Sequence, residues 1–527
     1  MRRLARDVLL LALATGISRV FGLFRDVAIA DRFGMTAAYD AFLIAFFIPH
    51  FLRQLLAEGA LSTAFVPVYT KYMLGSKREE APLAIVSPAS CDPAGAFASN
   101  LLSWLALLFP IVAAIGILIA PTYVPFLASG FSGEKLALAT TLTRIIFPFI
   151  ALIGLASVFM GILNAHHRFF AAALAPVWFN VGMILGVLLI APRFPDQPVI
   201  GLAIGALVGG AGQLLSQIPA LLRVGFRFRF SLFPLHPGIR RLLRLMGPAV
   251  LALAVTQVNL LVDNKIASHL SDGGISALQY GMRLFQFPLG VFAVSVATAL
   301  LPRFSAAWTN RDEAGFSSFL ADGVVTSALV LLPAMAGLLI IGTDAIRLLF
   351  EHGSFSAWDT LRTGRVLGFY VIGLLPYGWV YVFTRAFYAL GRTLFPLLAS
   401  LVGVGLNIAL DLALVSSMQE AGLALATAIA GVGSALLLGV ALWRFLKPAA
   451  GALRKLWLIT MGCLVLSALT LLVRWGIGAG PTWLAVFAPL CTAVTVYAAY
   501  VRFTPLWSCV VSLRRGDLER DEDLRGS

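Results

Sequence analysis

The chain has 527 residues, of which 60% are hydrophobic and only 12% are charged, and its formal net charge is +14. No soluble globular domain needs this much apolar surface. Apolar segments of about 20 residues recur along the whole length, and each is long enough to cross a hydrocarbon core. A transmembrane barrel would instead show short alternating segments. The sequence therefore predicts an all-α polytopic membrane protein, whose excess of cations reflects topology rather than nucleic-acid binding.

The apolar segments predict about fourteen transmembrane helices. They are expected at residues 8–30, 38–70, 97–120, 136–163, 170–191, 199–222, 241–268, 277–301, 316–341, 361–388, 394–415, 421–445, 455–474 and 482–503. If the N-terminus is cytoplasmic, most of the 39 Lys and Arg residues fall in cytoplasmic loops, as the positive-inside rule requires. The alternation of loops rich and poor in Lys and Arg predicts an even number of spans with both termini in the cytoplasm.

An internal repeat is visible at an offset of six spans. The segment "RDVAIAD" (25–31) is similar to "VDNKIAS" (262–268), and "NAHHR" (164–168) is similar to "YALGR" (388–392). Chance similarity in a biased composition is the alternative, but the matching positions favour two pseudo-symmetric six-helix lobes around a central cavity. The expected division is an N-terminal lobe at residues 1–226, a C-terminal lobe at 227–450, an extra helix pair at 451–505 and a cytoplasmic tail at 506–527.

Several charged residues lie within predicted spans, where each costs roughly 2.5–3.5 kcal/mol on insertion scales. The first span contains "SRVFGLFRDVAIADRFG", in which Ser18 and Gly22 allow a second helix to approach closely. Pro49 and Pro288 predict kinks in the second and eighth spans. The candidate cavity residues are Arg19, Arg25, Asp26, Asp40, Arg53, Glu58 and Arg283.

Cations outnumber carboxylates in this set, which indicates an anionic ligand. The planar fork of arginine suits a phosphate or pyrophosphate. Structural ion pairs are the alternative for any single arginine, namely Arg19 with Asp26, or Arg53 with Glu58 or Asp40. They do not explain the excess of cations. Asp26 is expected mainly as a counter-charge that holds Arg19 or another arginine.

A second polar group offers hard oxygen ligands. Asn407 and Asp411 are four residues apart and therefore share one helix face, and Asp263 and Thr427 lie in other spans. These oxygens suit a Na⁺ or H⁺ coupling site, whereas hydrogen bonding between helices is an equal alternative. The sequence predicts no cofactor, and Na⁺ is a candidate coupling ion.

No signature of an enzyme is apparent, since the chain has no phosphate-binding loop, metal-binding His cluster or nucleophile elbow. The spacing Gly201-x-x-x-Gly205-x-x-x-Gly209 lies inside a span and predicts helix packing.

The motifs identify a resemblance. The first-span segment, followed by "DAFLIAFFIPHFLRQLLAEGALSTAFVPVY", "ILNAHHRF" and "MRLFQFPLGVFAVSVATALLPRFS", resembles the MurJ (MviN) lipid II flippases of the multidrug/oligosaccharidyl-lipid/polysaccharide exporter superfamily. The resemblance implies that the cavity residues bind the pyrophosphate and headgroup, that the final helix pair forms a groove for the polyprenyl tail, and that Asp263, Asn407, Asp411 and Thr427 match a sodium site. The chain departs from the family pattern at His50, Gln54 and Met282.

The expected function is to flip lipid II, an undecaprenyl-pyrophosphate-linked disaccharide-pentapeptide, from the cytoplasmic to the periplasmic leaflet by alternating access. Cell-wall synthesis would depend on it. We expect a multi-pass monomer in the bacterial cytoplasmic (inner) membrane, in contact with membrane lipids and, as a further partner, the cell-wall synthesis machinery. The alternatives are a flippase for another polyprenyl-pyrophosphate-linked sugar, a cation-coupled drug exporter, which needs an acidic cavity, and a non-transporting scaffold.

Overall fold

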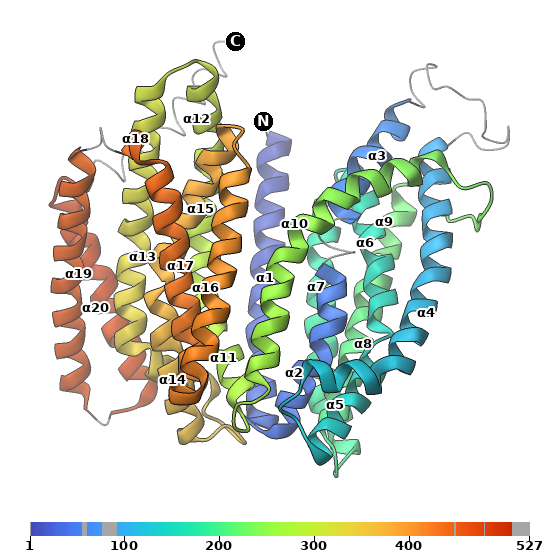
Figure 1. The fold of residues 1–527 in the computed structure, drawn as a ribbon, viewed down its shortest axis with the longest axis horizontal. Helices are drawn as coiled ribbons and strands as arrows, with labels where there is room; N and C mark the ends of the chain where they lie inside the picture. The colour runs from blue at the N-terminus through green and yellow to red at the C-terminus, as the bar shows by residue number, and fades with distance from the viewer. Residues whose placement is uncertain (1, 55–60, 76–91, 447–449, 479, 508–527) are drawn as a thin grey trace. The chain divides into compact units, whose positions relative to one another are not determined.

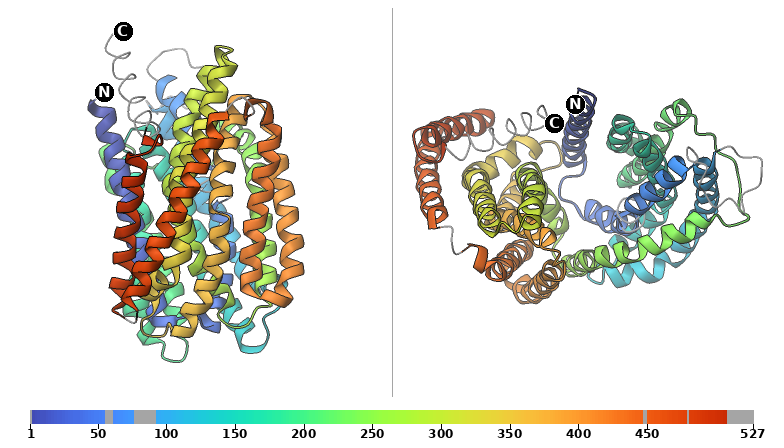
Figure 2. Two further views of the ribbon diagram at one scale, coloured as in Figure 1. Left: turned by 90° about the vertical axis from the view of Figure 1, so that its left-hand side faces the viewer. Right: turned by 90° about the horizontal axis from the view of Figure 1, so that it is seen from above.

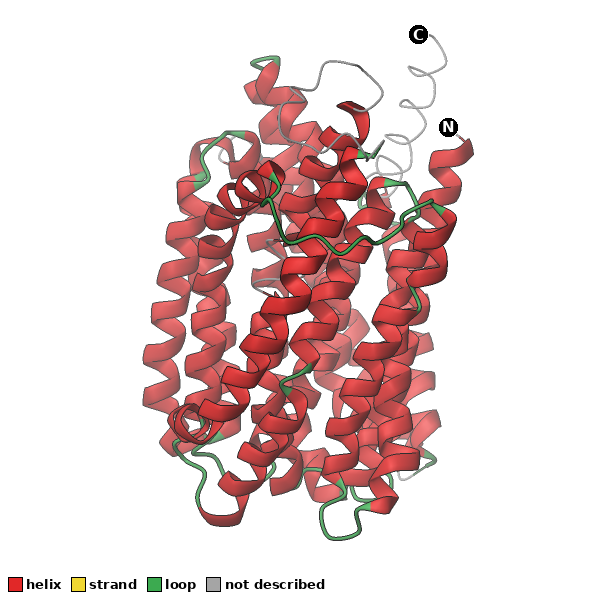
Figure 3. Cartoon of the chain, turned by 90° about the vertical axis from the view of Figure 1, so that its right-hand side faces the viewer, coloured by secondary structure: helices red, strands yellow, loops and turns green. Residues whose placement is uncertain are grey.

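The computed structural model describes residues 2–54, 61–75, 92–446, 450–478 and 480–507 (Figure 1). Contacts within the chain divide it into two compact units, Met1–Gly273 (unit 1) and Gly274–Ser527 (unit 2). Within each unit the longer helices run roughly along one axis (Figure 2). Figure 3 shows only helices and loops in the part of the chain that the structure describes.

The elements of both units are almost entirely α-helical. Unit 1 contains α1 (Arg2–Phe33), α2 (Ala37–Leu52), α3 (Ser62–Gly75), α4 (Pro93–Leu127), α5 (Gly133–Ile146), α6 (Phe149–Ala165), α7 (Phe169–Leu185), α8 (Val199–Leu215), α9 (Ile218–Arg223) and α10 (Pro237–Ala267). Unit 2 contains α11 (Gly274–Pro288), α12 (Val294–Thr309), α13 (Glu313–Phe350), α14 (Ala357–Ile372), α15 (Leu374–Ala389), α16 (Leu394–Met418), α17 (Glu420–Ala441), α18 (Trp443–Leu446), α19 (Ala450–Ile477) and α20 (Thr482–Arg502).

In the described residues each predicted span falls on one helix or on consecutive helical segments, and residues 55–60 of the predicted span 38–70 lie outside the described residues. Among the described residues, 11 helical stretches are long and apolar enough to cross a membrane. Large apolar side chains remain exposed on the helices, including Leu118 at 75% and Val440 at 71%. Such exposure is costly in water and normal in lipid. The chain is therefore an all-helical, multi-pass membrane protein, as the composition predicts.

The predicted repeat is visible in the way two helices end. His167 after α6 and Gly391 after α15 both have positive φ, at 58° and 68°. In each case the following amide donates to a carbonyl five residues back, Arg168 N to Leu163 O at 2.8 Å and Arg392 N to Phe387 O at 3.0 Å. This is the Schellman pattern that closes a helix. The same termination at the matched segments 164–168 and 388–392 supports the two-fold repeat.

Two long helices also begin alike. Asp92 caps α4 by accepting from Gly95 N at 2.9 Å, and Asp312 caps α13 by accepting from Gly315 N at 2.8 Å. Both caps have the spacing Asp-x-Ala-Gly, which satisfies a donor that the first turn leaves unpaired. These helices are the third and ninth predicted spans, which the predicted repeat would make equivalent positions of the two lobes.

The helix α10 belongs to unit 1 by its contacts, because it packs on α3 and α4. The predicted boundary between lobes, at 226/227, instead follows the sequence repeat and places α10 with the second lobe. That division, together with the extra pair at 451–505 and the tail at 506–527, stays a prediction. Residues 508–527 of the tail lie outside the described residues.

The glycine run of α8 is a helix-packing surface, as predicted. A Cβ added at Gly205 would lie 2.7 Å from Gly186 Cα, and one at Gly209 would lie 2.6 Å from Phe179 O. Both atoms belong to the backbone of α7 and the π-helical turn Gly186–Ile190 that extends it. Only small residues permit two helix backbones to approach this closely.

Candidate functional site

Arg25 on α1 is held in a defined orientation. Its Nε and Nη2 donate to Asp26 Oδ1 at 2.9 Å and 2.7 Å, and its Nη1 donates to Asn180 Oδ1 of α7 at 3.0 Å. The Arg25 and Asp26 side chains are only 11% and 12% exposed. Three fixed hydrogen bonds restrict a long side chain whose freedom would otherwise oppose binding. Asp26 is therefore a counter-charge, and the arginine it contacts is Arg25.

Asn180 is the residue that sequence reasoning missed. Besides accepting from Arg25, its Nδ2 donates to Ser18 O of α1 at 3.2 Å, and it faces Gly22, where an added Cβ would lie 3.8 Å from Nδ2. The predicted small pair Ser18 and Gly22 is thus the place where α7 approaches α1. A signal existed in the sequence, because no other charged, amide or hydroxyl residue occurs from Phe169 to Ala191.

A second polar group lies where α2 ends. Pro49 is inside α2, and Arg53 and Gln54, the last described residues before the gap at 55–60, have π-helical conformation directly after it. Arg53 Nη2 is 3.2 Å from His50 Nδ1, and Gln54 Oε1 accepts from Gln257 Nε2 of α10 at 2.6 Å. The departures from the family pattern at His50 and Gln54 therefore both lie in direct contacts of this turn. Single π-turns are frequent at functional sites.

Aromatic packing links these two polar groups. The Phe46 ring of α2 stacks on Phe179 of α7 with centroids 5.9 Å apart, and it packs against His50 at 5.6 Å. Phe179 immediately precedes Asn180. The α1–α7 contact and the α2 turn thus flank one aromatic cluster within unit 1. We call Arg25, Asp26, His50, Arg53 and Asn180 the arginine cluster.

Asp40 lies with a different set of residues. It is 1% exposed in the first turn of α2. Its Oδ2 accepts from Lys135 Nζ at 3.2 Å and from Gly273 N at 2.8 Å, and Lys135 also pairs with Asp272 at 2.7 Å. Asp40 and Lys135 therefore connect the starts of α2 and α5 to the segment after α10.

The remaining candidate cavity residues are dispersed. Arg19 is exposed on α1, and Glu58 lies outside the described residues. Arg283 is exposed on α11 of unit 2, ahead of Pro288 and the π-helical turn Leu289–Ala293. A proline and π-helical residues thus accompany an arginine in both units, near the positions Pro49 and Pro288 where the sequence predicts kinks.

Three of the four candidate sodium ligands lie on neighbouring helices of unit 2. Asn407 and Asp411 on α16 are 3% and 1% exposed, and α16 packs on α17, which carries Thr427. Thr427 Oγ1 donates to Leu423 O at 3.0 Å. A buried carboxylate and amide with a hydroxyl on the adjoining helix are chemically suited to Na⁺. Asp263 belongs to unit 1, where Asn259 Nδ2 donates to its Oδ2 at 2.9 Å.

Known proteins match the chain over most of its length. The family model described as "Lipid II flippase MurJ" matches residues 29–493. A "Lipid II flippase MurJ" of Burkholderia cenocepacia is 34% identical, covering 88% of this chain and 89% of that protein. A "Probable lipid II flippase MurJ" of Vibrio cholerae is 32% identical, with 92% and 91% covered. The chain belongs to the MurJ lipid II flippase family. It is a membrane transporter of that family and not an enzyme.

Solved structures agree with this assignment. One described as "Lipid II flippase MurJ, inward closed conformation" has a TM-score of 0.77 at 28% identity, covering 93% of this chain and 98% of that one. A multidrug resistance MATE transporter in an inward-facing conformation has a TM-score of 0.63 at 16% identity, covering 82% and 96%. The second likeness shows the fold alone.

Proposed function

We propose that the chain flips lipid II from the cytoplasmic to the periplasmic leaflet of the bacterial inner membrane, with both termini in the cytoplasm. The observation that carries the proposal is Arg25, which Asp26 and Asn180 orient inside unit 1. A fixed guanidinium can bind a pyrophosphate with paired hydrogen bonds. Family membership supports the substrate, because the relatives are described as lipid II flippases.

The candidate arginines differ in their expected contacts with the headgroup. Arg25 and Arg53 are partly buried arginines of unit 1 and would contact the pyrophosphate, whereas Arg19 is exposed on α1. Arg283 of unit 2 would also contact the headgroup. This assignment rests on the sequence pattern and on the place of Arg283 ahead of the π-turn. The apolar helix pair α19–α20 would take the polyprenyl tail, which the resemblance implies.

Transport would proceed by alternating access, biased by an ion. Na⁺ would be bound by Asn407, Asp411 and Thr427, and by Asp263 on the basis of the sequence alone. Its binding shifts the equilibrium between two conformational states only by the difference in its affinity for them. The membrane potential could supply roughly 2.3 kcal/mol per elementary charge for each 100 mV. An unchanged Na⁺ affinity after Asp411→Ala would remove that residue from the site.

The test is transport in proteoliposomes that contain the purified chain. Lipid II that reaches the outer leaflet is cleaved by an added enzyme that cannot cross the membrane. We expect cleavage to require the protein. Excess lipid II should compete for transport, whereas other polyprenyl-pyrophosphate-linked sugars should not. Equal competition by another lipid-linked sugar would assign the chain to the alternative flippase. Export of cationic drugs without lipid transport would assign it to the drug exporters.

A further inference from the structure

The helix pair α19–α20 lies outside the predicted duplication, so specific contacts must determine where it packs. Lipid tails are as apolar as leucine, and association inside a membrane therefore depends on close packing and polar contacts. Val325, Ala328 and Leu329 of α13 pack with Ile459 and Cys463 of α19. Such an apolar seam permits packing without specifying one position along the helix.

Polar contacts join the pair to α13 at two levels. Tyr497 of α20 donates through its hydroxyl to Leu329 O at 2.9 Å. Asp344 lies further along α13, about 22 Å from Leu329 at roughly 1.5 Å per residue, and it contacts Arg474 of α19. The two contacts hold the two helices of the pair to α13 at different heights, α20 at Leu329 and α19 at Asp344.

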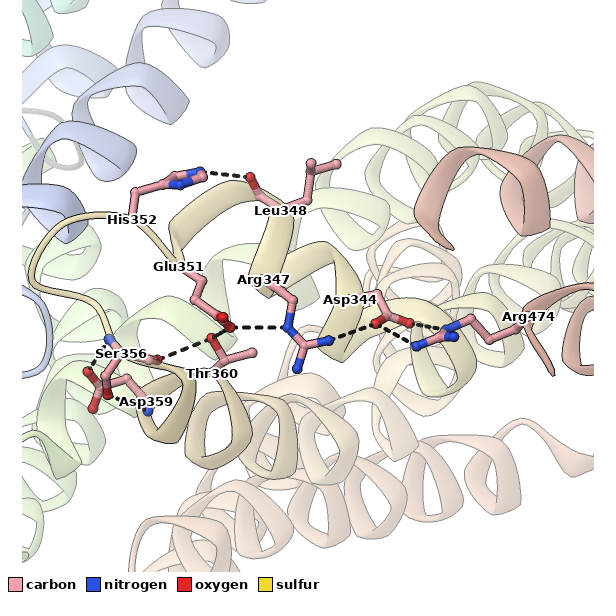
Figure 4. Close-up of polar contacts among 9 residues, drawn as sticks. All are labelled: Asp344, Arg347, Leu348, Glu351, His352, Ser356, Asp359, Thr360 and Arg474. Carbon is pink, nitrogen blue, oxygen red and sulfur yellow. Dashed lines mark hydrogen bonds and ion pairs between the residues drawn. The ribbon is translucent and has the colours of Figure 1, made fainter. Parts of the chain in front are cut away.

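The contact between Asp344 and Arg474 is a two-point ion pair (Figure 4). Arg474 Nε donates to Asp344 Oδ2 at 2.6 Å, and Nη2 donates to Oδ1 at 3.1 Å. The Asp344 side chain is 8% exposed and that of Arg474 is 28% exposed. Arg474 Nη1 also donates to Gly478 O at 3.0 Å, beyond the end of its own helix. Parallel guanidinium–carboxylate bonds fix direction as well as distance.

The carboxylate is itself part of a network that reaches α14. Arg347 Nη1 donates to Asp344 Oδ1 at 3.4 Å, and Arg347 Nε donates to Glu351 Oε2 at 3.2 Å. Thr360 of α14 donates to the same Glu351 oxygen at 2.6 Å. Figure 4 shows these groups in a continuous row from Thr360 to Arg474. The position of α19 is thereby coupled to α13 and α14 at the helix ends.

We infer that the Asp344–Arg474 pair is a positioning contact that holds α19–α20 in the place where the pair receives the lipid tail. The inference rests on the proposed function. Asp344 and Arg474 are not expected to touch the headgroup. They determine whether the long tail of the substrate finds an apolar surface of fixed shape, and they therefore affect recognition of the tail rather than of the pyrophosphate.

The experiment measures binding of two lipids by the purified full-length chain in nanodiscs. The lipids share the lipid II headgroup and differ in the tail, which is undecaprenyl in one and farnesyl in the other. Wild type should bind the undecaprenyl form more tightly. Asp344→Ala should weaken binding of that form about tenfold, because truncating one partner of a buried pair leaves the other uncompensated. Binding of the farnesyl form should not change.

Two further variants separate positioning from general damage. Arg347→Ala removes a neighbour that contacts Asp344 and not α19, and it should leave the tail preference intact. The reversed pair Asp344→Arg with Arg474→Asp should restore the preference that either single change loses. Restoration would show that the variants fold and that the contact itself matters.

The outcomes distinguish this inference from the proposed function. If wild type prefers the long tail and Asp344→Ala retains that preference, or loses affinity equally for both lipids, the positioning contact is refuted and the proposed function stands. If wild type binds neither lipid, the proposed function fails and the inference fails with it. Loss of the preference in Asp344→Ala, with its return in the reversed pair, supports both.

Discussion

The arginine cluster of unit 1 and the helix-end network of unit 2 use the same residue type in different ways. Around the arginine cluster, the carboxylate partner of Arg25 is its neighbour Asp26 on the same helix, and the contacts that join helices are made by neutral amides. Asn180 bridges α7 to α1, and Gln257 bridges α10 to the α2 turn. In unit 2, Arg474 and Arg362 each meet a carboxylate of another helix. An amide orients a guanidinium without neutralising it, whereas a carboxylate consumes its charge.

This contrast suggests two functions for buried arginines. Arg25 has one counter-charge in Asp26, and its contact with the neighbouring helix adds no second one, so charge is left for an anionic ligand. A cation that joins helices needs a permanent counter-charge, because a buried charge without a partner is costly. The variants below separate the two roles by comparing transport with stability.

The largest effect is expected at Arg25. Arg25→Ala should reduce transport by roughly 10- to 100-fold, since a hydrogen bond to a charged group contributes about 1.5–3 kcal/mol. Arg25→Lys should restore little, because a single ammonium cannot reproduce the fork. Growth of cells depleted of their own flippase, together with cleavage of exported lipid II, measures the loss. The unfolding midpoint in detergent should fall as well, because Asp26 loses its counter-charge, so transport is compared per folded molecule. Normal export by Arg25→Ala would contradict the binding role.

A different pattern is expected for the ion pair between Arg362 of α14 and Glu420 of α17. Their side chains are 16% and 10% exposed and 2.8 Å apart. Arg362→Met should lower the free energy of unfolding by about 2 kcal/mol, because it leaves a carboxylate uncompensated. Adding Glu420→Leu should recover part of that loss. Chemical unfolding in detergent measures both, and transport per folded molecule should be unchanged. A transport defect without a stability defect would place this pair with the arginine cluster.

A smaller effect is expected at Asn180, where the direction is more informative than the size. Asn180→Ala removes an acceptor from Arg25 and should lower transport about fivefold, which corresponds to about 1 kcal/mol. Asn180→Asp should be worse than Asn180→Ala, because a second carboxylate would neutralise the guanidinium. If the contact only joined α1 to α7, Asn180→Asp would strengthen it and preserve transport. Trp178→Phe, at an exposed position of the same helix, is the control.

The sequence predicted the spans and the close helix approach at Ser18 and Gly22, because these follow from local pattern. It did not predict the partners of the charges. Asp26 was expected to hold Arg19 or another arginine, and the arginine that it meets is its neighbour Arg25. Asp40 was expected in the cavity; it lies in the first turn of α2 and meets Lys135, and its place in the cavity stays a prediction.

Contacts between distant segments account for the rest. Asn180 and Arg25 are 155 residues apart in the chain, and no local rule brings them together. The same holds for Arg474 and Asp344, which are 130 residues apart. Both pairs form because neighbouring helices align at one height, and that alignment depends on packing along their whole length.

His236, at the start of α10, allows the contrast between neutral and charged acceptors to be tested with a proton. It is 8% exposed, its Nδ1 accepts from Gly238 N at 3.1 Å as the cap of α10, and its own amide donates to Asn100 Oδ1 of α4 at 3.0 Å. Its ring packs against Tyr72 and Phe97. Burial lowers the pKa of His236 from its ordinary value of 6.5, so the neutral cap is the folded form.

The sign of the pH effect follows from this shift. The unfolded chain binds the proton at higher pH than the folded chain, so stability is complete above about pH 6.5 and is lost as the pH falls through the lowered pKa. A protonated ring would also oppose the positive end of the helix dipole. The unfolding midpoint in detergent should therefore decrease as the pH is lowered from about 8 to about 5. His236→Asn keeps a capping oxygen that does not titrate, so the decrease should be smaller in that variant. His167→Asn, at an exposed position with positive φ that asparagine tolerates, should not change the slope. An equal reduction in both variants would mean that the slope reports general histidine titration, and the neutral acceptor at the start of α10 would then have no special role in stability.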